Sequence, residues 1–170
     1  IGAVFIDEKN DVNWALVIRN IGTQFSSYNG VNERLPLEII AGVSQELENV
    51  PIRWHLTLEN LQQWNIAFVN PSKSKSSFDG QITDEKISFV SNALRHVIMG
   101  VELFPKRAFN LRVGYNFRRA EELRLLEQRN FSGVSLGFGL KMNKLKFNYS
   151  YSRYTLAGNT SLFGLTMNFQ

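Results

Sequence analysis

Phe109-Asn-Leu-Arg-Val-Gly-Tyr-Asn-Phe-Arg118 is the stretch of sequence that decides the fold. Its odd-numbered residues are apolar or aromatic, and its even-numbered residues are polar or glycine. Successive side chains of a β-strand point to opposite faces, whereas a helix repeats its apolar positions every three or four residues. The alternation therefore predicts a strand with one apolar and one polar face.

The same alternation recurs on both sides of this stretch. It is clear over 52–59, 134–142, 145–152 and 163–169, and weaker over 2–6, 14–21, 37–46 and 97–103. Together with 109–118, these ranges give nine predicted strands in a single domain that covers all 170 residues. We therefore expect an all-β fold built from antiparallel strands.

The connections between the predicted strands alternate in length. Short turns are expected near 7–11, 48–51, 105–107 and 143–144, and long loops near 22–36, 62–92, 118–130 and 155–160. Transmembrane β-barrels have short periplasmic turns and longer extracellular loops. The pattern thus predicts the C-terminal strands of an antiparallel transmembrane barrel whose C-terminus is periplasmic. Because such barrels have an even number of strands, further N-terminal strands are expected before Ile1.

Composition restricts the possible partners and chemistry. The chain is 44% hydrophobic, has no cysteine and carries a net charge of +4. Without cysteine it has no disulfide framework and no thiolate metal site. The basic residues are scattered, and no nucleic-acid-binding motif accompanies them, so we expect no nucleic-acid partner. No apolar stretch is long enough for a transmembrane helix, which leaves strands as the membrane-crossing element. A soluble sandwich with an aromatic core is the alternative fold.

Sequence motifs for catalysis are weak. Gly133-Val-Ser135-Leu-Gly137 matches the pattern of a nucleophile elbow, but the elbow needs a turn into a helix, and here the strand pattern continues. The chain has two histidines, His55 and His96, without the spacing of a zinc motif. We therefore expect neither an enzyme nor a cofactor.

Charged residues fall on the polar face of several predicted strands. In a barrel this face lines the lumen, and the candidate lumen-facing residues are Arg53, His55, Glu59, Glu102 and Arg112. They could pair across neighbouring strands and stiffen the wall, or they could line a passage. Structural pairing is favoured, because the interior of a narrow barrel is filled by side chains.

Two long loops carry helical patterns. Thr83 is a candidate cap for a helix that starts at Asp84 and presents Ile87, Val90 and Leu94, and residues 119–129 form a charged segment with helical propensity. The candidate partner-binding residues in these loops are Phe68, Phe78, Leu123, Leu126 and Arg129. Basic loop residues could also meet the phosphates of lipopolysaccharide, which with outer-membrane lipid is an expected partner.

Several motifs resemble a known family. Arg19-Asn-Ile-Gly22 with Leu35-Pro36, Gly100-Val-Glu-Leu-Phe-Pro105 and Ser132-Gly-Val-Ser-Leu-Gly-Phe-Gly139 are similar to the PorV/PorQ outer-membrane proteins, and nearer to the PorQ branch. The resemblance implies a FadL-like barrel of about fourteen strands in the outer membrane of a Gram-negative bacterium of the Bacteroidota. It also implies a role in the type IX secretion system, as a non-catalytic anchor for a surface protein of the attachment complex (PorZ-like, with PorU and PorV). The alternative is a FadL-like channel for hydrophobic small molecules.

Overall fold

The computed structural model describes residues 1–22, 35–68, 75–76, 82–83, 87–123, 131–153 and 158–168. Within them the prediction of an all-β chain is confirmed, since nine antiparallel strands form one sheet and only two short helices accompany it. The sheet contains β1 (Gly2–Asp7), β2 (Val12–Arg19), β3 (Glu38–Glu46), β4 (Ile52–Leu58), β7 (Val97–Leu103), β8 (Phe109–Asn116), β9 (Val134–Met142), β10 (Leu145–Arg153) and β11 (Asn159–Met167). The remaining elements are β5 (Lys75–Ser76), β6 (Ile82–Thr83), α1 (Phe89–Arg95) and α2 (Phe117–Glu122).

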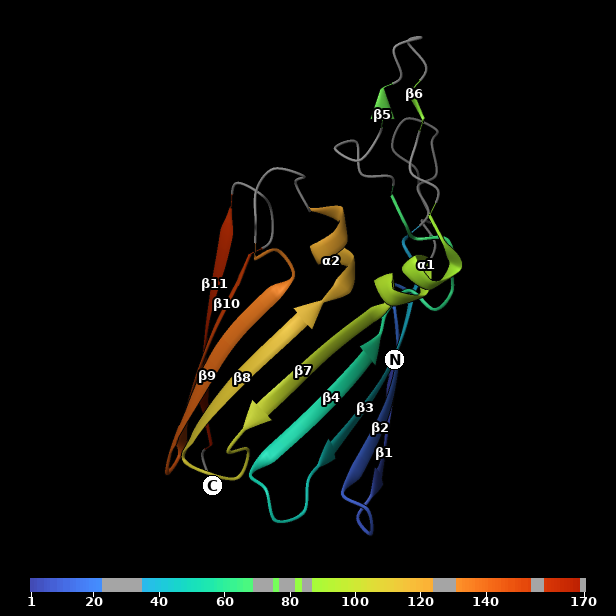
Figure 1. Cartoon of the computed structure of the whole chain (residues 1–170). Helices are drawn as coiled ribbons and strands as arrows, with labels where there is room; N and C mark the ends of the chain where they lie inside the picture. Colours follow the sequence, from blue (N-terminus) through green and yellow to red (C-terminus); the bar gives the residue numbers. More distant parts are fainter. Residues whose placement is uncertain are drawn as a thin grey trace.

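The sheet is a meander in which each strand pairs with the next strand of the sheet along the chain. Its order is β1-β2-β3-β4-β7-β8-β9-β10-β11, while β5 and β6 pair only with each other. The predicted alternation of short and long connections is present from β1 to β10: the short turns lie at the lower end of the sheet in Figure 1, and both helices lie at the upper end. The long loop predicted near 155–160 is wrong, because β10 ends at Arg153 and β11 begins at Asn159, so this connection is only as long as the turn between β7 and β8. The tightest turn is Asn143–Lys144, where Asn143 adopts a positive φ of 42°, a backbone conformation that asparagine tolerates well.

Several predicted ends of helices and strands differ from the observed ones, because side-chain caps or strand pairing determine where these elements begin and end. The helix predicted with Val90 and Leu94 is present as α1, but its predicted start and cap are wrong: Thr83 belongs to β6, and α1 begins at Phe89, capped by the Ser88 hydroxyl. Asp84 lies outside the described residues. The strand predicted to reach Arg118 ends at Asn116, whose side chain caps α2 by accepting a hydrogen bond from the Arg119 amide at 2.9 Å. The last strand begins at Asn159 rather than at 163, since pairing with β10 extends to Arg153. The strand predicted over 14–21 spans Val12–Arg19.

One face of the sheet is apolar and exposed. The register places on it, among others, Trp14, Leu16, Met99, Val101, Leu111, Val113, Leu136, Leu140, Phe163 and Leu165. Leu136 is 50% exposed and Leu165 is 68% exposed. Among the described residues Ile66 is the one buried hydrophobic side chain, at 8% exposure, so no second layer covers this face.

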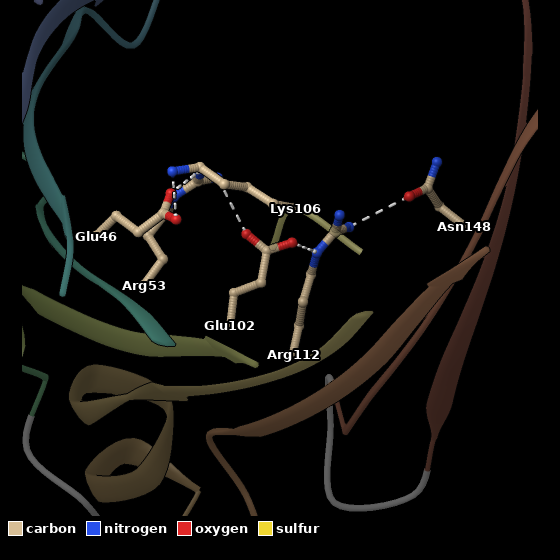
Figure 2. A network of polar contacts seen from close by, with 6 residues as sticks. All are labelled: Glu46, Arg53, Glu102, Lys106, Arg112 and Asn148. Atoms are coloured by element: carbon tan, nitrogen blue, oxygen red, sulfur yellow. Dashed lines mark hydrogen bonds and ion pairs between the residues drawn. The ribbon is translucent and has the colours of Figure 1, made fainter. Parts of the chain in front are cut away.

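The opposite face is polar and rich in small residues from β4 to β10, whereas on β1 and β2 it also carries Val4, Ile6 and Val17. The sheet curves around this face (Figures 1 and 2). Gly100, Gly114, Gly137 and Gly139 all lie on this concave face, in three neighbouring strands. Three of them make room for a polar neighbour, which is the Ser135 hydroxyl in the case of Gly114. A Cβ at Gly100 would overlap the imidazole of His55, and one at Gly139 would lie 2.6 Å from Oδ1 of Asn110. Small residues thus let larger polar side chains lie flat against the concave face.

Candidate functional site

A network of charged side chains crosses the concave face from β3 to β10 (Figure 2). Arg53 on β4 donates to Glu46 at 3.0 Å and to Glu102 at 3.3 Å. Arg112 on β8 donates from Nε to the other oxygen of Glu102 at 3.1 Å, and from Nη1 to Oδ1 of Asn148 on β10 at 3.3 Å. Glu102 therefore joins two guanidinium groups, and its side chain is only 12% exposed.

The network is assembled by the register of the strands. Glu46 lies opposite Arg53, Arg53 opposite Glu102, and Glu102 opposite Arg112, so that four charges of alternating sign stand side by side on consecutive strands. Cross-strand pairs of opposite charge stabilise a sheet by roughly 0.2–1 kcal/mol each. The bond from Arg112 to Asn148 passes over β9, where Gly137 and Gly139 provide the space.

Lys106, in the turn between β7 and β8, adds a fifth charge at the edge of the network. Its Nζ lies 2.8 Å from Oε1 of Glu46. The hydrogen bond to Glu46 and the attraction of its carboxylate raise the pKa of Lys106 above its ordinary value. Because Lys106 is well exposed, solvent screens this pair, and we assign it little stabilising free energy.

A hollow of about 380 Å³ lies beside the network on the concave face. We call it the central hollow, and it is lined by His55, Arg112, Ser135, Asn148, Ser150 and Leu162, among others. His55 lies over Gly100, and Arg112 and Asn148 connect the hollow to the ion pairs. The lining combines hydroxyl, amide and guanidinium groups with apolar carbon, which makes up most of its surface, so it suits an amphipathic solute.

A second polar cluster fixes the segment after β4 to α1. Both ring nitrogens of His96 lie near carbonyl oxygens: Nδ1 is 2.7 Å from the Glu59 oxygen and Nε2 is 3.0 Å from the Trp64 oxygen. Arg95 donates to the Phe68 carbonyl at 2.9 Å, and the Asn92 amide donates to the Trp64 carbonyl. Asn92, Arg95 and His96 are all buried, so hydrogen bonds between buried polar groups help to hold this end of the sheet together.

Aromatic rings add to the second cluster. Trp64 stacks on the His96 ring with centroids 5.5 Å apart, and it contacts Phe89 of α1 at 4.8 Å. Phe68 is 68% exposed, and the guanidinium of Arg118 on α2 lies 6.0 Å from the centre of its ring. The end of the sheet with the long connections thus presents ordered aromatic side chains to the surroundings.

The structure brings together four of the five predicted lumen-facing residues. Arg53, His55, Glu102 and Arg112 share the concave face, and three of them belong to the network. Glu59 lies one residue beyond the end of β4, half-buried, where loss of hydration and the nearby carboxylate of Glu38 raise its pKa.

The predicted partner-binding residues fall partly outside the described residues. Phe68 is exposed, and Leu123 is half-buried at the end of α2. Phe78, Leu126 and Arg129 lie outside the described residues. Phe68 is therefore the exposed aromatic residue at which this prediction can be tested.

Glu46, Lys106 and Asn148 were not predicted as members of the network. Their polar character was visible, but their partners depend on which strand residues lie opposite each other. The buried positions of Asn92 and Arg95 were not predicted either, because exposed and buried polar residues look alike in a helical pattern.

Comparisons with known proteins assign no relative to this fold. Neither protein-family models, nor curated proteins, nor solved structures gave a match to this chain. In the described part of the chain, His, Asp and Glu residues nowhere gather in a group of three or more that could hold a metal ion. The helices described here are too short and too polar to cross a membrane.

Proposed function

We propose that this chain forms part of the wall of an outer-membrane β-barrel that acts as a non-catalytic anchor for a surface protein. The observation that carries the proposal is the placement of apolar and charged side chains, which is the reverse of that in a soluble protein. Apolar residues are exposed on the convex face, and ion pairs lie on the concave face. A soluble sheet covers its apolar face with a second layer, whereas a barrel wall turns that face to lipid and its polar face to the lumen.

The exposed apolar face supports a lipid contact. It extends across every strand from β1 to β11, and large apolar patches on soluble monomers are uncommon. Strands in lipid need every backbone hydrogen bond made, and the continuous antiparallel pairing from β1 to β11 supplies those bonds along the sheet. Among the described residues, the middle of the outward face carries no carboxylate, ammonium or guanidinium group: Leu111, Phe138 and Tyr149 lie opposite one another there.

An anchor is favoured over a channel because ion pairs bridge the concave face. The network spans β3 to β10, so its side chains and their hydration occupy space that an apolar solute would need. The central hollow is the feature that suits a channel, and its lining carries Arg112 and His55. The motif resemblance to the PorV/PorQ family supports placing the anchor in the type IX secretion system, beside a PorZ-like surface protein.

The partner contact is proposed at the end of the sheet that carries the long connections. There Phe68 offers an exposed ring on a segment that Arg95 and Arg118 fix in place. Aromatic and arginine side chains are enriched at the energetic centres of protein interfaces. Docking of a surface protein would cover this ring. The segment that carries the ring is already held by its buried polar contacts.

The test is affinity purification of the tagged full-length protein from native outer membranes in mild detergent. We expect stoichiometric recovery of a surface protein, and a Phe68→Ser variant should reduce that recovery by about tenfold, a usual loss for an aromatic interface residue. Leu61→Ser is the matched control, because Leu61 is also exposed and lies in the same connection. Recovery of the barrel alone, with bound fatty acid or lipid, would replace the anchor by the channel.

A further inference from the structure

A second hollow lies on the concave face at the end of the sheet that carries the short turns. It measures about 270 Å³, and we call it the basic hollow. Arg107 reaches it from the turn between β7 and β8, while Lys141, Lys144 and Lys146 reach it from the hairpin of β9 and β10. Its remaining lining residues include three asparagines and one threonine, and no carboxylate is among those described.

The basic hollow carries positive charge that no described residue compensates. Lys141 and Lys146 lie directly opposite each other on paired strands, and like charges in that position destabilise a sheet. In the charge network on the same face, by contrast, each guanidinium group pairs with a carboxylate. Within the described residues, none of the four cations of the basic hollow has an ion-pair partner. A bound anion would relieve this repulsion.

A buried amide completes the basic hollow. Asn110 is only 6% exposed, and its Oδ1 has no hydrogen-bond partner in the described part of the chain. Gly139, directly opposite on β9, leaves the room that this side chain occupies. The Asn110 side chain therefore brings an amide group, whose nitrogen carries two N–H donors, to the lining of the hollow.

We propose that the basic hollow binds a small anion through its phosphate groups. Lysine ammonium groups bind phosphate as point charges, and a pyrophosphate-like group has enough oxygen atoms to meet several cations and the amide at once. A single carboxylate has one charge and two oxygens, so it would leave most of the four cations unmatched. The proposal goes beyond the anchoring function and does not depend on it.

Calorimetric titration of inorganic pyrophosphate into the full-length protein in neutral detergent tests the proposal. A Lys141→Gln/Lys146→Gln double variant removes the cross-strand cations, and Lys144→Gln removes a turn cation without touching a strand. Lys9→Gln is the control, because Lys9 lies in another short turn, outside the basic hollow. Each cation removed should weaken binding about fivefold in low salt, and added salt should weaken it further.

The outcomes separate the proposal from its alternatives. Equal binding by wild type and by Lys9→Gln, with weaker binding by both hollow variants, supports it. A second arm compares nanodiscs of phosphatidylglycerol with nanodiscs of phosphatidylcholine. If phosphatidylglycerol abolishes pyrophosphate binding, a lipid headgroup is the source of the phosphate, and if it does not, the source is a soluble anion. Absence of pyrophosphate binding in detergent, or equal affinity in wild type and the hollow variants, would overturn the proposal.

Discussion

The Leu111→Arg substitution tests most directly whether the apolar face contacts lipid. Leu111 lies on the apolar face opposite Phe138, which is the middle residue of the nine-residue strand β9. At a rise of about 3.4 Å per residue and a tilt of about 40°, β9 spans roughly 23 Å, close to the apolar band of about 25 Å in an outer-membrane barrel. Leu111 would therefore lie near the middle of the bilayer.

A cation at that depth costs about 2–4 kcal/mol. This lowers the equilibrium constant for folding in lipid by a factor of about 30 to 900. We expect much less folded Leu111→Arg protein in outer-membrane fractions, and a lower urea midpoint in vesicles. Ser150→Arg is the matched control, because Ser150 is exposed on the concave face, one strand beyond β9, and its charge would meet water. Equal yields of the two variants would refute the assignment of the apolar face to lipid.

Three further predictions concern the polar side chains. Glu102→Gln should lower the free energy of unfolding by about 1–3 kcal/mol in denaturant titrations, because two guanidinium groups lose their shared carboxylate; an unchanged midpoint would show that the network is not stabilising. Gly100→Ala should destabilise through overlap with the His55 ring, and His55→Ala in the same chain should restore part of the loss, as a double-mutant cycle would show. The raised pKa of Glu59 means that burial of its charge costs stability above the unfolded-state pKa near 4.5, so Glu59→Gln should match wild type at pH 4 and exceed it at pH 7 in denaturation midpoints.

The strands were predictable because their signal is local. Residues 109–116 and 134–142 alternate strictly, and a backbone with a period of two converts that alternation directly into two chemically different faces. The short turns were predictable for the same reason, since they are the places where the alternation stops. Helix starts were not, because they depend on which side chain caps the first turn. The helix was predicted from Asp84 with Thr83 as its cap, but Thr83 belongs to β6 and α1 begins five residues later, at Phe89, where Ser88 caps it.

The sequence by itself determined the number of strands in the sheet, their antiparallel succession and which side chains share a face, since these depend on neighbours along one chain. The tertiary structure alone decided that Arg53, Glu102 and Arg112 stand opposite one another and that Lys141 meets Lys146. A register shifted by two residues would keep every face intact and replace all of these partners. The faces of the sheet therefore follow from local backbone geometry, whereas the charge network and the basic hollow follow from pairing between distant segments.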